Sequence, residues 1–141
     1  MILISACLAG FNTRYDGTNC GEDRFIKLVA DGKAIPVCPE ELGGLKTPRE
    51  PVELLKGSTA IGRDSGKDYS SNFMKGADEV LEMAKLHHIK RVILKDGSPS
   101  CGSTYIKIDG GKCAGRGITA ELLIKEGIIV ETERIRYVLP L

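Results

Sequence analysis

The chain alternates between short apolar runs and longer segments in which apolar residues recur every three or four positions. Each apolar run ends where glycine or polar residues begin, a pattern typical of a buried β-strand followed by a loop. The predicted strands are residues 1–6, 35–37, 91–95 and 128–131.

Helical periodicity fills three of the segments between these runs. The clearest pattern has Ser70 or Ser71 available as N-cap, and the last has Gly127 in the position that commonly ends a helix. The predicted helices are residues 24–30, a long helix that follows an N-cap at Ser70 or Ser71 and ends near His87, and residues 119–126.

This order of strands and helices predicts an α/β fold. We expect a single domain over residues 1–141, with a three-layer, mostly parallel, Rossmann-like sheet and helices on both faces. In such sheets ligands bind outside the carboxyl ends of the strands. Residues 43–67 have no helical period and predict a long loop, within which 52–55 and 59–63 form a weak hairpin.

Composition narrows the class of protein. With 141 residues, 42% hydrophobic and 28% charged, the chain is typical of one globular domain. A net charge of +1 argues against a nucleic-acid partner, and no apolar stretch is long enough to span a membrane. The apolar opening run lacks the basic region of an export signal, so we expect a cytoplasmic protein.

Three of the five cysteines follow predicted strands. Cys7 and Cys38 come directly after the first and second strands, and Cys101 lies six residues after the third. If these strands are parallel neighbours, their thiols meet at one edge of the sheet. A single free cysteine is most often a small buried hydrophobe, but three at equivalent positions favour a functional site.

Two metal chemistries suit three cysteines on separate segments. Zinc prefers tetrahedral thiolate and imidazole ligands, although the closely spaced ligand pairs typical of zinc sites are absent from this sequence. A [4Fe-4S] cluster held by three thiolates leaves one iron open to substrate. Cys20 and Cys113 are candidates for a fourth ligand, but we interpret them as incidental thiols.

Six motifs give the chain a resemblance to the thiouracil desulfidases and the bacterial and archaeal proteins related to them. The motifs occur in order over nearly the whole chain, at residues 5–10, 14–17, 36–45, 48–51, 98–102 and 117–120. The resemblance implies that Cys7, Cys38 and Cys101 hold a [4Fe-4S] cluster whose open iron takes the sulfur of a thiolated base. It also implies that Glu40 and Ser98 are catalytic.

The chemistry of these two side chains agrees with those roles. A carboxylate such as Glu40 can deprotonate water, and the hydroxyl of Ser98 can donate to substrate or receive a proton. Considered alone, Glu40 is better interpreted as a helix N-terminal carboxylate and Ser98 as a turn or cap hydroxyl. Asp16 could orient the substrate or form an ordinary Asp-Gly turn, and Arg49 could hold an anionic group of the substrate or pair with Glu50 or Glu53.

We therefore predict an iron–sulfur enzyme that removes sulfur from a small thiolated compound, giving the oxo product and sulfide. Air is expected to destroy such a cluster. The alternatives are a non-enzymatic iron–sulfur or zinc-binding protein or sulfur carrier, and a metal-free cysteine hydrolase or redox enzyme. The last is weakened by the absence of a C-x-x-C motif and of a Cys/His partnership.

Overall fold

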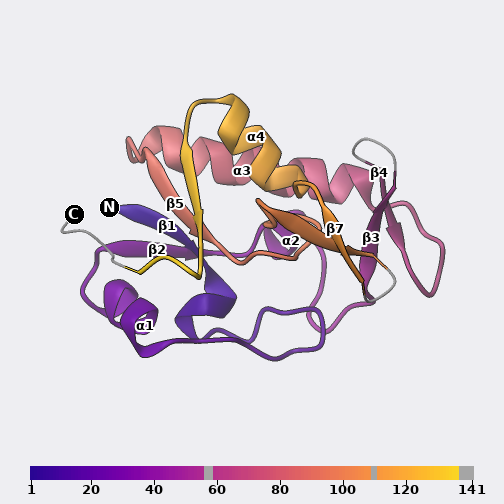
Figure 1. Cartoon of the computed structure of the whole chain (residues 1–141), viewed down its shortest axis with the longest axis horizontal. Coiled ribbons are helices and arrows are strands. Elements are labelled where there is room, and N and C mark those ends of the chain that lie inside the picture. Colours follow the sequence, from indigo (N-terminus) through magenta and orange to yellow (C-terminus); the bar gives the residue numbers. More distant parts are fainter. Residues whose placement is uncertain (56–58, 109–110, 137–141) are drawn as a thin grey trace.

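Four parallel strands form the central sheet of the computed structural model, which describes residues 1–55, 59–108 and 111–136 (Figure 1). Their order across the sheet is β2-β1-β5-β8. The strands are β1 (Ile2–Ser5), β2 (Ala34–Val37), β5 (Arg91–Leu94) and β8 (Ile129–Thr132). The predicted α/β fold is confirmed, and each predicted strand is present within two residues of its expected bounds.

The register of the sheet aligns the ends of its strands. Ile4 of β1 lies opposite both Pro36 of β2 and Ile93 of β5. Because all three strands run in the same direction, their carboxyl ends emerge at one edge. The three cysteine-bearing strands are therefore parallel neighbours, with β1 in the middle.

Helices cover both faces of this sheet. In Figure 1, α3 and α4 lie side by side on one face, and α1 lies on the other. The helical segments are η1 (Ala6–Ala9, 3-10), α1 (Asp23–Ala30), α2 (Pro39–Leu42), α3 (Ser70–Leu86) and α4 (Ile118–Lys125). The three predicted helices are present, whereas η1 and α2, each only four residues long, were not predicted.

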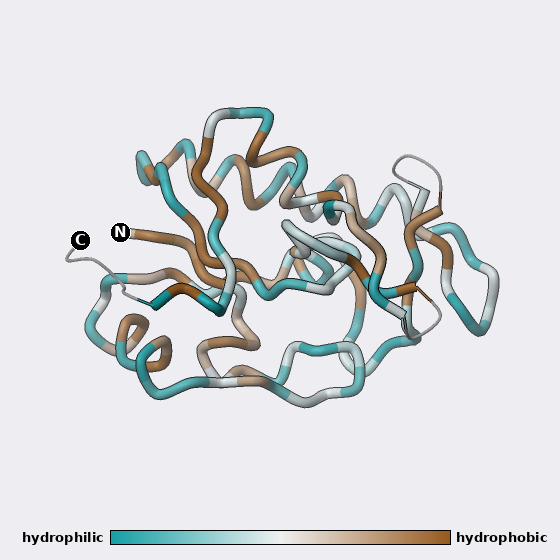
Figure 2. The backbone as a smooth tube through the Cα atoms, viewed as in Figure 1, coloured by the Kyte–Doolittle hydropathy of each residue, from teal (hydrophilic) through white to brown (hydrophobic). Residues whose placement is uncertain are grey.

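Strand β1 is the centre of the core, with all four of its residues buried. Leu3 packs in the apolar cluster shared with α3 and α4, whereas Ile2 and Ile4 pack with Phe25 of α1 on the opposite face. This burial on both faces explains why the strand is a continuous apolar run rather than an alternating one. Figure 2 shows the corresponding hydrophobic colouring through the middle of the sheet.

Two antiparallel hairpins extend the molecule beyond the sheet. The first pairs β3 (Val52–Leu55) with β4 (Thr59–Gly62), which confirms the predicted hairpin inside the long loop. The second pairs β6 (Tyr105–Ile108) with β7 (Gly111–Ala114) and was not predicted. Since β3 contacts β6, the two hairpins form one rim beside the sheet edge.

The predicted cap of the long helix was wrong. Tyr69 is the N-cap of α3 and its side chain makes no capping hydrogen bond, whereas Asp68 Oδ1 accepts from the backbone N–H of Ser70 at 2.8 Å. The hydroxyl of Ser70 instead accepts a hydrogen bond of 2.9 Å from the backbone N–H of Ala60, which ties α3 to β4. At the end of α4, Gly127 has φ +82° and occupies the predicted position after the C-cap.

Among the described residues, no helix combines the length and apolar character required to cross a bilayer.

Two glycines allow α2 to cross closely over α3. A Cβ atom on Gly76 would lie 1.9 Å from the carbonyl oxygen of Pro39, and one on Gly43 would lie 2.0 Å from that of Asn72. Both close atoms belong to the backbone, so a side-chain rotation could not relieve the clash and the helices themselves would have to move apart. The crossing therefore fixes the short helix that carries Glu40.

We predict that Gly76→Ala lowers the free energy of unfolding by about 1–3 kcal/mol, the usual range for overpacking. Helix propensity alone would change stability in the opposite direction, by up to about 1 kcal/mol. Urea unfolding followed by circular dichroism measures the change. Lys75→Ala, at an exposed neighbouring position, is the control and should be nearly neutral. A Gly76→Ala protein as stable as the wild type would contradict the proposed close contact.

Candidate functional site

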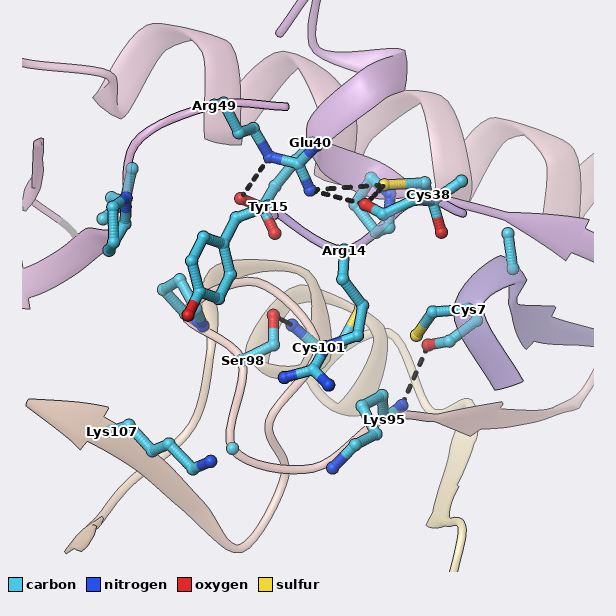
Figure 3. Close-up of a pocket in the computed structure, with 18 of the residues that line it drawn as sticks. Cys7, Arg14, Tyr15, Cys38, Glu40, Arg49, Lys95, Ser98, Cys101 and Lys107 are labelled. Atoms are coloured by element: carbon cyan, nitrogen blue, oxygen red, sulfur yellow. Dashed lines mark hydrogen bonds and ion pairs between the residues drawn. The ribbon is translucent and has the colours of Figure 1, made fainter. Parts of the chain in front are cut away.

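A cavity of about 340 Å³ lies at the carboxyl edge of β1, β2 and β5. Residues from the strand ends, the segment before α1, α2, both hairpins and the loop after β5 line it, as Figure 3 shows in part. This volume is in the range of pockets that bind small molecules. Its place at the sheet edge is where ligands bind in open parallel sheets.

The structure brings the thiols of Cys7, Cys38 and Cys101 to this cavity. Cys7 lies in η1 immediately after β1, Cys38 is the N-cap of α2, and Cys101 lies in the loop after β5. In Figure 3 the three side chains approach the cavity from three separate segments. Their placement follows from the parallel sheet, because each thiol lies only a few residues past a strand end.

All three thiols resist ionisation in this environment. Burial raises the pKa of Cys101 to about 12 and also raises that of Cys38. For Cys7, a hydrogen bond with Cys20 is the largest cause of a raised pKa, followed by burial and by the charges of the neighbouring cysteines. Repulsion between thiolates contributes at Cys7 and Cys101, so a bound cation would favour their ionised forms.

The donor set suits a cluster better than a single ion. Within the described part of the chain, no three His, Cys, Asp or Glu side chains converge as ligands of one metal ion. An iron–sulfur cubane does not need that convergence, since each thiolate binds a different iron. Three sulfur ligands around one cavity fit such a group, which soft thiolates prefer.

Glu40 lies in the first turn of α2 and forms a largely buried ion pair with Arg49. The Arg49 Nε atom donates to Glu40 Oε1 at 3.2 Å, and the two side chains are only 8% and 13% exposed, respectively. Arg49 also donates to the carbonyl oxygen of Thr13 and to the hydroxyl of Thr47, at 2.8 and 2.6 Å. These contacts hold the carboxylate at the cavity wall and join three loops.

Ser98 also lines the cavity, and its oxygen organises the turn that leads to Cys101. The Ser98 Oγ atom accepts hydrogen bonds of 3.1 Å from the backbone N–H groups of Ser100 and Cys101. Two amides therefore point at the serine oxygen, an arrangement that stabilises negative charge on it.

A buried carboxylate anchors the loop that carries Ser98 and Cys101. Asp96 Oδ1 accepts from the backbone N–H groups of Gly97, Ser103 and Thr104 at 3.0–3.1 Å. The Thr104 hydroxyl and the Arg134 guanidinium bind Oδ2. Burial opposes ionisation of Asp96, but the hydrogen bonds from Thr104 and Arg134 outweigh it and hold the pKa well below its usual range.

The cavity has an excess of positive charge. Arg63 and Lys95 line it but pair with Glu53 and Glu133. The side chains of Arg14 and Lys107, in contrast, make no hydrogen bond or ion pair with any other residue of the described ranges. Figure 3 shows Arg14 reaching between Ser98 and Lys95. Such a cavity favours a ligand that carries negative charge.

The structure does not bring Asp16 to the cavity. Its exposed carboxylate accepts from the N–H and hydroxyl of Thr18, at 3.1 and 2.6 Å, as in the ordinary turn considered from the sequence. Cys113 is exposed on β7. Cys20 is less incidental than expected, because its N–H donates to the carbonyl oxygen of Cys7 at 3.0 Å and its thiol contributes to the raised pKa of Cys7.

The fold and the cavity define an α/β protein that presents three thiols, a buried carboxylate and a serine hydroxyl at one sheet edge. The chain belongs to the 2-thiouracil desulfurase family, whose model matches residues 2–134.

Two similar proteins extend this comparison. The chain is 42% identical over 144 residues to the uncharacterised protein YbbK of Bacillus subtilis (strain 168), covering 94% of this chain and 95% of YbbK. The solved structure of TudS, a [4Fe-4S]-dependent thiouracil desulfidase, matches with a TM-score of 0.87 at 40% identity. This match covers 94% of the present chain and 89% of TudS.

We predict that Asp96→Asn lowers the free energy of unfolding of the metal-free protein at pH 7 by about 1–3 kcal/mol, because an amide keeps only one acceptor oxygen, whereas both carboxylate oxygens of the buried Asp96 accept hydrogen bonds. Thermal unfolding measures this change. The matched control is Asp78→Asn, at an exposed position on α3, which should be nearly neutral.

The stability difference between the wild type and Asp96→Asn should also depend on pH. The pKa of Asp96 is lowered by folding, so its contribution is fully present above the unfolded value of about 3.9 and is lost as the pH falls below it. The difference between wild type and Asp96→Asn should therefore be constant from about pH 5 to 7 and shrink below about pH 4. A difference that grows on acidification would contradict the assignment of Asp96 as an ionised anchor.

Proposed function

We propose that this protein is a [4Fe-4S]-dependent desulfidase that converts a small thiolated compound of the thiouracil type into its oxo product and sulfide. The observation that carries the proposal is the convergence of three thiols with Glu40 and Ser98 on one cavity. Membership of the 2-thiouracil desulfurase family and the likeness to TudS support the same reaction and the same cofactor.

Cys7, Cys38 and Cys101 are the residues that would hold the cluster. When bound, the cluster would supply an iron without a protein ligand, a Lewis acid with high affinity for the sulfur of the substrate. The three thiols occupy one end of the cavity wall, which leaves Arg14, Tyr15 and the β6–β7 hairpin to contact the rest of the substrate.

Glu40 and Ser98 would manage the proton of the attacking water. Water adds to the carbon that bears sulfur and loses a proton, for which Glu40 is the final acceptor. The carbon–sulfur bond then breaks, and sulfur leaves with both electrons of the bond and takes the proton held by Glu40. The remaining hydroxyl proton is released as the C=O bond forms, so the thione and water give the oxo product and hydrogen sulfide. The atoms balance without a change in oxidation state, so the reaction needs no external electron donor.

A binding protein or sulfur carrier is less well supported. Such a protein requires ligands for its cargo but no base and no hydroxyl beside it, whereas Glu40 and Ser98 are both held against the cavity by specific hydrogen bonds. We also infer that residues 1–141 work as one domain in the cytoplasm. The nearly full-length family match and the preference of free thiols for a reducing compartment support this.

The first test is metal content. Protein purified without oxygen should be brown and contain about four irons and four sulfides per chain, the composition of a cubane cluster. Single Cys→Ser substitutions at Cys7, Cys38 and Cys101 should abolish iron retention, measured by iron analysis and visible absorbance. Cys113→Ser, at an exposed site, is the matched control and should retain the wild-type content. Stoichiometric zinc without iron would contradict the proposal.

The second test separates holding the cluster from using it. Glu40→Gln and Ser98→Ala should keep the cluster spectrum but slow sulfide release from 2- or 4-thiouracil by about 10²–10⁴-fold, the usual contribution of general acid–base catalysis. Loss of thione absorbance measures turnover under anaerobic conditions.

Controls for this test come from neighbouring positions. Glu41→Gln changes the adjacent carboxylate on the same short helix, and Ser103→Ala changes another serine of the same loop. Both should keep activity near the wild-type rate. If cluster-replete wild-type protein leaves thiouracils and other small thioamides unchanged, the carrier function should replace the desulfidase function.

A further inference from the structure

A third serine lies between the two side chains assigned to proton transfer. Ser100 is 1% exposed and is not among the residues that line the cavity. Its Oγ atom lies 3.2 Å from Ser98 Oγ and donates to Glu40 Oε2 at 3.3 Å. Ser98 of the loop after β5 and Glu40 of α2 are thus joined by one buried hydroxyl.

The hydrogen-bonding capacities of Ser98, Ser100 and Glu40 determine which group donates and which accepts in each of these two hydrogen bonds. The Ser100 hydroxyl has two acceptors within reach, Glu40 Oε2 at 3.3 Å and Cys101 Sγ at 3.8 Å, and the carboxylate oxygen is the nearer and the stronger acceptor. In the relay geometry the Ser100 proton therefore points to Glu40. Ser98 Oγ already accepts from two backbone N–H groups, which occupy its two lone pairs. The Ser98 proton is therefore the one that joins the two hydroxyls, and Ser100 accepts it.

The two carboxylate oxygens of Glu40 have different partners, so a proton that comes from Ser100 would arrive at Oε2. Its Oε1 atom is engaged by Arg49 at 3.2 Å, whereas its Oε2 atom faces Ser100. A guanidinium does not release a proton at neutral pH. The ion pair with Arg49 therefore holds the Glu40 carboxylate in place but does not exchange a proton with it.

The fold holds Ser100 rigidly in this position. Its carbonyl oxygen accepts from the N–H groups of Thr119 and Ala120, at 2.9 and 3.1 Å, in the first turn of α4. Gly117 packs so closely that a Cβ atom there would lie 2.5 Å from the Ser100 carbonyl carbon. The first turn of α4 therefore fixes the backbone of the relay.

We propose that Ser100 is a positioning residue that relays a proton from Ser98 to Glu40 during water attack. This inference rests on the desulfidase function proposed above. Water gives a proton to Ser98 Oγ as Ser98 gives its own to Ser100 Oγ and Ser100 gives its own to Glu40 Oε2. The hydroxide left behind bonds to carbon, and the proton stored on Glu40 returns by the same path to the departing sulfide.

The two amides at Ser98 have a defined part in this relay. As Ser98 loses its proton, its oxygen gains alkoxide character and a third lone pair. Two lone pairs of the Ser98 oxygen continue to accept from the N–H groups of Ser100 and Cys101. The third lone pair accepts the proton of water. Ser98 thus remains a hydroxyl after each transfer, and Ser100 acts without touching substrate.

Kinetics in mixtures of light and heavy water test the relay. Wild-type turnover of thiouracil should depend on deuterium fraction along a curve, because several protons move together. Ser100→Ala should retain iron and substrate affinity, lose about tenfold or more in kcat, and give a straight line. Ser100→Thr restores a hydroxyl and should recover rate and curvature, while Ser103→Ala should match the wild type.

Infrared spectra of the metal-free protein provide a readout that does not depend on turnover. Glu40→Gln identifies the carboxylate band by removing it, and Ser100→Ala should shift that band, because the carboxylate loses a donor. Ser103→Ala should leave it in place.

The outcomes separate the two proposals. Absence of wild-type turnover overturns the desulfidase function, and an unshifted carboxylate band overturns the hydrogen-bonded chain. With an active wild type, a Ser100→Ala protein of unchanged kcat, or of reduced kcat with a still curved deuterium dependence, overturns the relay. If Ser100→Ala does not fold, a straight line for the wild type alone overturns it.

Discussion

The parallel pairing of β1 with β2 and with β5 is the constraint on which the site depends. A four-residue strand is about 13 Å long, so reversing any one of these strands would carry its cysteine to the opposite edge of the sheet. With all three parallel and in register, Cys7 and Cys38 lie within two residues of a strand end, and the loop after β5 needs only to fold back to add Cys101. Burial of the sheet on both faces keeps that register fixed, because a one-residue shift would exchange the residues that face α1 and α3.

Beyond the strand ends, polar interactions rather than apolar packing determine where the loops go. Asp96 accepts hydrogen bonds from the backbone of the loop after β5. Its carboxylate also forms an ion pair with Arg134, from a distant part of the sequence. Arg49 performs the corresponding task for the segments around Thr13 and Glu40. These groups are mostly shielded from water, so each hydrogen bond is worth more than at the surface and its loss leaves a buried group without a partner.

Much of the fold and the location of the site could be predicted from the sequence, because apolar runs and cysteines just beyond them are local patterns. The second hairpin could not, because β7 is exposed along its length and has no apolar alternation. Ser100 looked like any loop serine, since its partner Glu40 is 60 positions away and the contact forms only in the folded chain. Asp16 shows the converse, because a motif position suggested a role that its local turn does not support. The catalytic roles of Glu40 and Ser98 stay predictions.

Arg14 and Lys107, the cavity cations that pair with no residue in the described part of the chain, affect how fast a ligand arrives rather than how the reaction proceeds. Charges of one sign in a recess focus the electric field toward solvent and draw oppositely charged molecules inward before any contact is made. Dissolved ions screen that attraction over about 8 Å at physiological ionic strength, so it acts only near the mouth. Capture of an anionic ligand would therefore slow as salt rises, while the rate of the bound complex, protected from bulk ions, would stay the same.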